Sequence, residues 1–166
     1  VRHSHVREHL EFGARRLHFI RAPGPPIAED DVRLLRFFRV DATYGDGAPE
    51  RVGYLACIAG RGGLSGLSAE RIRMEMLKLV VAKGAASAVV AMADGGLLQP
   101  LVGGVCYTGP FAAMTDVERE MGLAPSAIRR LGALTVAVTE DARRVTTRLR
   151  LSNAEAKALD SMGHRW

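Results

Sequence analysis

Aromatic residues are scarce in this sequence, at 5% of the chain, so they cannot dominate a hydrophobic core. The core must instead rest on Leu, Val, Ala, Ile and Met, and abundant Ala and Leu favour packed helices over β-sandwiches. Hydrophobic residues at 48% and charged residues at 25% are typical of a globular protein, which excludes a disordered chain. The fold class predicted from this composition is all-α.

Cysteines and long hydrophobic runs are also few. Cys57 and Cys106 both lie in apolar stretches, so we expect buried free thiols rather than a disulfide, and a cytoplasmic location. The apolar run 85–93 is too short to span a bilayer and is bounded by Gly84 and Asp94. The first residues contain no apolar signal-peptide core. The sequence therefore predicts no membrane segment.

Patterns that bind catalytic metal ions are missing as well. Two-metal centres need two or three convergent carboxylates, which a strand supplies as Asp-x-Asp, and this spacing occurs nowhere in the chain. Asp30 and Asp31 are consecutive, so on a helix their side chains point apart. His3, His5 and His9 have no cysteine partner and fit a solvated polar segment better than a zinc site. We expect neither a metal ion nor a catalytic residue in this chain.

Positive charge is what the chain has in excess. Its net charge is +5 and its isoelectric point is about 9.8, which favours a partner that carries phosphates. Six arginines gather in the C-terminal part of the chain: Arg129, Arg130, Arg143, Arg144, Arg148 and Arg150. We expect these arginines to contact an RNA backbone, and a solvated face without function is the alternative.

Helical periodicity and turn signals divide most of the chain into helices. The first expected helix begins near Ala28 and ends in the segment 44–49. Its predicted apolar face comprises Leu34, Leu35, Phe38 and Ala42. Ser68 is a good N-cap for a helix that runs to about residue 82, and Ser152 is a good cap for the last helix. The other expected helices cover residues 50–59, 85–93, 126–138, 140–149 and 153–162, and a flexible connector covers 60–66.

Residues 13–21 are the exception, because they read as a short β-strand followed by the rigid proline-rich link 22–26. A lone strand cannot satisfy its own backbone groups, so we interpret residues 1–27 as the remnant of an absent domain plus a linker. Residues 28–94 and 95–166 are then expected to form two helical regions. An unpaired strand recruits another chain, which favours a homo-oligomer through residues 13–21.

Asp30 and Arg33 form the sharpest candidate for a binding site. Three residues apart on a helix, they project from nearly the same face, one offering hydrogen-bond acceptors and the other donors. Such a pair can accept from the exocyclic amino group of cytosine or adenine and donate to the adjacent ring acceptor. Uracil and guanine present a carbonyl at that position instead. The alternative is an acidic helix start with a surface ion pair.

Three parts of the chain carry a family resemblance. Residues 15–20 (RRLHFI) and 27–39 (IAEDDVRLLRFFR) resemble the segment that leaves the catalytic head of class II tRNA nucleotidyltransferases, the CCA-adding enzymes, and of bacterial poly(A) polymerases. This segment contains the EDxxR motif of those enzymes. Residues 67–79 (LSAERIRMEMLKL) are similar to a later motif in the helical neck, and residues 148–155 (RLRLSNAE) to a stretch of the helical body.

The resemblance implies a helical neck and body without the catalytic head. It implies that Asp30 and Arg33 pair with the base of incoming CTP or ATP, and that Arg36 lies near the same pocket. The residues that would brace this pocket are Glu70, Arg71 and Glu75. The RNA partner implied is the 3′ end of tRNA, and Mg²⁺ is expected in the head rather than in this chain.

Two readings compete with a CCA-adding enzyme. A poly(A) polymerase carries the same motifs, so the motifs do not separate these two enzymes. A stand-alone helical RNA-binding or scaffold module, descended from such an enzyme, is the rival from another class. An upstream domain of ~130–150 residues, about the size of one domain, with Gly-Ser and Asp-x-Asp signatures would separate a transferase from such a module.

The missing carboxylates predict that this chain alone transfers no nucleotide. Incubation with Mg²⁺, labelled ATP or CTP and a tRNA without its 3′ end should give background incorporation, because no residue set here holds the two ions. Incorporation clearly above that of a boiled sample would overturn this expectation.

Overall fold

The computed structural model of this chain describes residues 27–163, with side chains from Val32 onward. Within that range every regular element is a helix, which confirms the predicted all-α class. The predicted strand 13–21, the link 22–26 and the three histidines lie outside the described residues. No helix between residues 27 and 163 combines the length and the apolarity needed to cross a bilayer.

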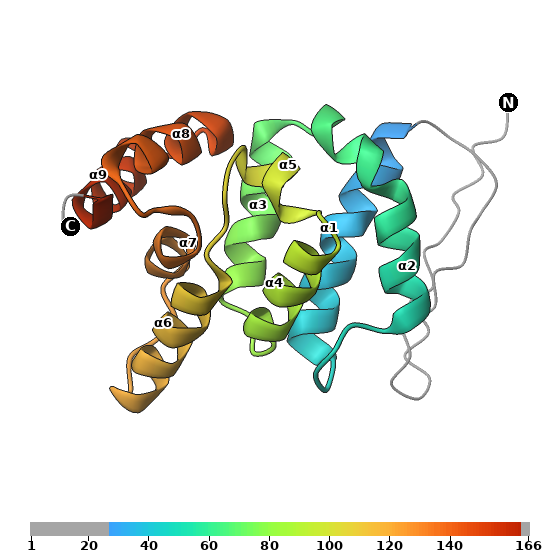
Figure 1. Ribbon diagram of the computed structural model, residues 1–166, viewed down its shortest axis with the longest axis horizontal. Helices are drawn as coiled ribbons and strands as arrows, with labels where there is room; N and C mark the ends of the chain where they lie inside the picture. Colours follow the sequence, from blue (N-terminus) through green and yellow to red (C-terminus); the bar gives the residue numbers. More distant parts are fainter. Residues whose placement is uncertain (1–26, 164–166) are drawn as a thin grey trace, which may run out of the picture.

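Helix α1 (Ile27–Tyr44) is held by a wide apolar face. The predicted face is confirmed, because its four residues each expose 9% or less of their surface. Val32 and Phe37 are buried as well, so neighbours cover more of α1 than predicted. The neighbours are α2 (Arg51–Gly60), α3 (Ala69–Val80) and α4 (Ala85–Asp94), as Figure 1 shows.

The connection from α2 to α3 differs from the prediction. The glycine-rich segment 60–66 was expected to be a flexible connector, and it forms the 3₁₀ helix η1 (Arg61–Gly66). Leu64 in η1 is fully buried, and Leu67 just after it is 6% exposed. These two leucines anchor the segment to the core, which outweighs the conformational freedom of its glycines.

Helix α3 lies at the centre of the fold (Figure 1). Its N-cap is Ser68, as predicted, with the hydroxyl accepting from the Arg71 amide at 3.4 Å. The apolar side of α3 packs against α1, and its other flank meets α7 (Ala127–Thr135) and α8 (Thr139–Leu149). α1 and α3 run in the same direction, because α2 and η1 return the chain to its starting level (Figure 1).

The turn after α3 is fastened to the end of α1. The amide of Gly84 donates to the carbonyl of Ala42 at 2.7 Å. A Cβ at Gly84 would lie 2.9 Å from that same oxygen, so a larger residue would push the turn away from α1. Glycine at 84 thus permits a close backbone contact between segments that are far apart in the sequence.

Two helices were not predicted, α5 (Leu98–Val102) and α6 (Thr108–Glu120). Each has a proline at its third position, Pro100 and Pro110, and proline reads as a helix breaker. In the first turn of a helix the amide has no intrahelical partner, so proline is tolerated there. Leu101 and Phe111 are fully buried and fix these helices to the core.

The C-terminal helices α7, α8 and α9 (Asn153–Gly163) follow the predicted order. α7 ends at Thr135, three residues before the predicted end, because the Asp141 carboxylate caps the amides of Ala137 and Val138 at the start of α8. Ser152 caps α9 as predicted and exchanges hydrogen bonds with Glu155 in a capping box.

A buried ion pair joins α3 to α6 and α7. Glu118, 1% exposed, accepts from Nε of Arg129 at 2.7 Å and from Nε of Arg130 at 2.6 Å. Arg130 also donates through Nη1 to the carbonyl of Val80 at 2.9 Å. One carboxylate therefore bonds two arginines, and one of these satisfies a backbone carbonyl at the end of α3.

We predict that Glu118→Gln lowers the free energy of unfolding by about 3–5 kcal/mol, because it leaves the Arg130 charge buried without a counter-charge. Urea unfolding of the two proteins measures this difference. Asp116→Asn is the matched control, since Asp116 pairs with Arg119 on the surface, where the side chains are 53% and 74% exposed. The control should change stability by about 0.5 kcal/mol or less. Equal losses in the two variants would contradict the role given to Glu118.

Candidate nucleic-acid interface

The predicted base-selecting residues lie in the first turns of α1. Asp30 is the fourth residue of the helix, and only its backbone is described. Arg33 follows one turn later and is half-buried, while Arg36 is exposed. The helical backbone places Asp30 and Arg33 about 60° apart around the axis, as the spacing predicted. α1 is fixed beneath them by its apolar face.

An arginine that the sequence analysis did not single out connects α1 to α3. Nε of Arg39 donates to Oε2 of Glu75 at 2.6 Å, and the Glu75 side chain is only 2% exposed. Glu75 therefore contacts the neighbouring helix. A carboxylate between the buried residues Ile72 and Met76 is a signal for such a partner, because a buried charge requires one.

The other two predicted brace residues are exposed at the start of α3. Glu70 accepts from Nη1 of Arg150, so it connects α3 to the end of α8. The backbone amide of Glu70 itself and the Arg150 guanidinium lower the pKa of this carboxyl. Arg71 is exposed one residue further on.

Arg73 completes the charged contacts of α3. Its Nη2 donates to both carboxylate oxygens of Glu155, at 2.8 and 2.9 Å, at the start of α9. Burial opposes ionisation of Glu155, but the Ser152 amide and the Arg73 guanidinium outweigh it and lower the pKa of Glu155. α3 therefore bonds to α1 on one side and to α8 and α9 on the other.

The six C-terminal arginines do not form one uniform surface. Arg130 is 7% exposed and bonded to Glu118, so little of its surface is open to an RNA backbone. Arg129 is bonded to the same carboxylate, and its side chain is 35% exposed. Burial raises the pKa of Glu118, but hydrogen bonds from Arg130, Arg129 and the Ser126 amide reverse this effect and lower it.

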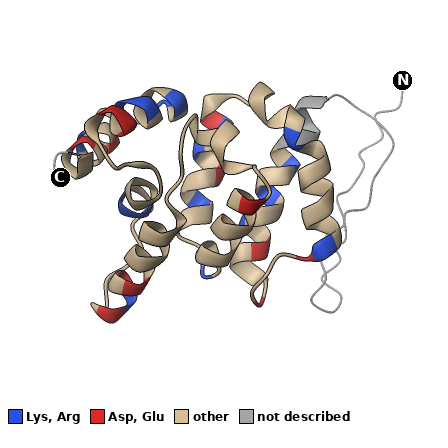
Figure 2. Cartoon of the chain, in the orientation of Figure 1, with Lys and Arg blue, Asp and Glu red and all other residues tan. Residues whose placement is uncertain are grey.

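The arginines of α8 and its C-terminal end face outward to different degrees. Arg144 pairs with Asp141 and is 32% exposed at its side chain, whereas Arg148 donates to the carbonyl of Pro100 at 2.9 Å. Arg150 is 72% exposed in its pair with Glu70. Arg143 is exposed, and its side chain makes no hydrogen bond or ion pair within the described part of the chain. Figure 2 shows Lys and Arg along α8, and Asp and Glu at the far end of α6.

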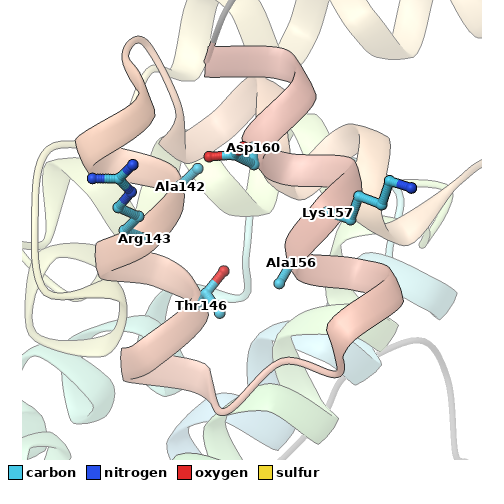
Figure 3. A pocket seen from close by; sticks show the side chains of 6 residues that line it. All are labelled: Ala142, Arg143, Thr146, Ala156, Lys157 and Asp160. Atoms are coloured by element: carbon cyan, nitrogen blue, oxygen red, sulfur yellow. The ribbon is translucent and has the colours of Figure 1, made fainter.

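A groove of about 340 Å³ lies between α8 and α9 (Figure 3). Ala142, Thr146 and Ala156 line its floor. Arg143 and Lys157 stand on opposite rims and point away from each other, and Asp160 points inward between the helices (Figure 3). The groove is open to solvent and carries charges of both signs, so it does not form an enclosed site for one small ligand.

The described residues contain no group of three or more His, Cys, Asp or Glu side chains that could hold a metal ion. Both cysteines are free thiols, as predicted; Cys57 is buried and Cys106 is half-buried. Burial raises the pKa of Cys57 to about 12 and that of Cys106 to about 11, so both stay protonated at neutral pH.

One comparison with known proteins bears on this surface. Residues 60–106 match a protein family described as "Probable RNA and SrmB- binding site of polymerase A". The match covers η1, α3, α4 and α5, and it includes Glu70, Arg71 and Glu75. None of the curated proteins compared with this chain matches it. Residues 60–106 are therefore similar to an RNA-binding region of polymerase A, which supports an RNA partner for this part of the chain.

Proposed function

We propose that this chain is the nucleotide-selecting and RNA-contacting helical part of a polymerase-A-like nucleotidyltransferase, acting on the 3′ end of tRNA with CTP and ATP as substrates. The observation that carries this proposal is the match at residues 60–106, within which α3 bonds directly to the helix of the EDxxR motif through Arg39 and Glu75. The matched region and α1 thus pack together as one unit. The resemblance to the EDxxR motif is the ground for the role that we propose for α1.

Base selection is the role we propose for the start of α1. Asp30 and Arg33 would read the Watson–Crick edge of the incoming base, with Arg36 one turn further along. Selection requires a rigid reader, because a mobile carboxylate could turn away from a mismatched base. The buried face of α1 and the Arg39–Glu75 pair supply that rigidity.

RNA contact is the role we propose for the exposed arginines of the C-terminal part. Arg143 has no counter-charge among the described residues, and Arg148 is bonded to a neutral carbonyl, so both keep a full positive charge toward solvent. Arg150 is exposed enough to exchange Glu70 for a phosphate. Arg129 and Arg144 contribute less, because each is held by a carboxylate that is largely or fully buried.

A poly(A) polymerase remains the alternative within the same class, and a stand-alone RNA-binding or scaffold module the alternative outside it. The match at 60–106 fits all three, since it concerns RNA binding and not the reaction. The Mg²⁺ ions of a transferase would belong to a catalytic head outside this chain. Sequencing the native gene upstream for an Asp-x-Asp domain separates a transferase from the module.

We predict that the chain binds a tRNA acceptor-stem hairpin with an affinity that falls steeply with salt. Replacing Arg143, Arg148 and Arg150 by Ala should lower the salt slope of log K by about 2–3, because each phosphate contact contributes about 0.9. Filter binding over a salt series measures this slope. The charge-matched control replaces Arg51, Arg119 and Lys157, which are exposed on other elements. An equal drop in both triple variants, or a flat salt dependence, would argue against these contacts.

We also predict that Asp30 and Arg33 select the base without performing the reaction. In a protein that includes the catalytic head, Asp30→Ala should raise the relative use of UTP and GTP by roughly one to two decades, because it removes a mismatch penalty of about 1–3 kcal/mol. Arg33→Ala should weaken CTP and ATP incorporation together. The measurement is kcat/KM for all four nucleotides. Asp30→Ala losing all four equally would assign the residue a catalytic or structural role instead.

A further inference from the structure

A second basic surface lies on the neighbouring outer sides of α1 and α3. We call it the α1–α3 strip and define it by Arg36, Arg39, Arg71, Lys78 and Lys83. All of these are exposed except Arg39, which is half-buried at the junction of the two helices. No function was predicted from the sequence for Arg39, Lys78 or Lys83.

Two hydrogen bonds fix how the strip is aligned. Arg39 bonds Glu75 in the middle of α3, and Gly84 bonds Ala42 at the end of α1. The helices therefore run side by side in the same direction (Figure 1). Along α3, residues 71, 75 and 78 fall within about 60° around the axis, so Arg71 and Lys78 flank the Arg39–Glu75 pair. They are separated by about 10 Å along the helix axis.

The net charge of the strip is positive. Glu75 is the acidic residue on it, and its buried carboxylate is already neutralised by Arg39. The side chains of Arg36, Lys78 and Lys83 make neither a hydrogen bond nor an ion pair within residues 32–163. Met74, 45% exposed, lies between Arg71 and Lys78 and adds apolar surface. Cations in a row with apolar surface between them fit a nucleic-acid strand, whose phosphates and bases alternate in the same way.

We infer that the α1–α3 strip binds the backbone of single-stranded RNA and leads its 3′ end toward the base-selecting turns of α1. This inference rests on the proposed function, since Arg36 is the residue of the strip closest in sequence to Asp30 and Arg33. A 3′ end that is extended without a template strand is unpaired at the point of addition. Its phosphates therefore need cations that follow a single strand, separately from the arginines proposed for the duplex stem.

The test uses the full chain and two labelled probes, an unstructured RNA of about ten nucleotides and an acceptor-stem hairpin. Arg36→Ala with Lys78→Ala should weaken binding of the single strand by roughly 10–25-fold at about 0.1 M salt and lower its salt slope by about 1.4. The charge-matched control, Arg51→Ala with Arg119→Ala, should change it by less than about threefold. All four residues are exposed, and urea unfolding of each variant checks that the fold is kept.

The outcomes separate this inference from the proposed function. Loss of single-strand binding in the strip variant alone supports the inference. Equal losses in the strip variant and its control, or no loss in either, overturn it, while hairpin binding that depends on Arg143, Arg148 and Arg150 leaves the proposed function standing. Failure of the unaltered chain to bind either RNA overturns both.

Discussion

The buried carboxylate of Glu118 is the interaction on which the arrangement of the helices depends. Two positive charges from α7 and one backbone carbonyl from α3 are satisfied through it, directly or through Arg130. Removing one partner would leave a charge in a region that water does not reach, which costs more than an isolated surface pair contributes. The ion pair also fixes how α6 and α7 are oriented on α3, because a guanidinium bonds its acceptors in a plane. Apolar contacts alone are not directional and would let α6 and α7 slide over α3.

Helix α3 distributes its charged residues among different neighbours. Glu75 faces α1, Arg73 faces α9, Glu70 faces the end of α8, and the carbonyl of Val80 faces Arg130. Residues of a motif are often assigned to a ligand, but here three of them have a protein partner in the structure. Their proposed part in RNA binding is consequently indirect: they hold the helices that present Arg36, Lys78 and Arg143 to solvent.

Much of the fold could be predicted from local signals. The apolar stripe of α1 and the caps at Ser68 and Ser152 depend on residues within one or two turns, so the sequence displays them directly. The remainder depends on distant partners. Nothing near Arg130 distinguishes it from Arg143, although one is buried against Glu118 and the other is exposed. The pairing of Arg39 with Glu75 spans 36 residues, and α5 and α6 were concealed by prolines that local rules read as breaks. For the candidate site, the EDxxR spacing indicated α1 and the resemblance implied a brace from α3, but the Arg39–Glu75 pair that joins the two helices required the three-dimensional structure.

The hydrogen bond from Gly84 to Ala42 fixes the position of one end of α1. This end is the C-terminal one, and it is bonded to the turn between α3 and α4. The two backbones can come this close because residue 84 has no side chain. From Ala42 to Asp30 the helix extends about 18 Å. With the far end fixed and the apolar face buried, the N-terminal turns cannot shift along the helix axis. A rotation of a few degrees about Ala42 displaces Asp30 by about 1 Å, which is the scale on which a hydrogen bond to a base is made or lost.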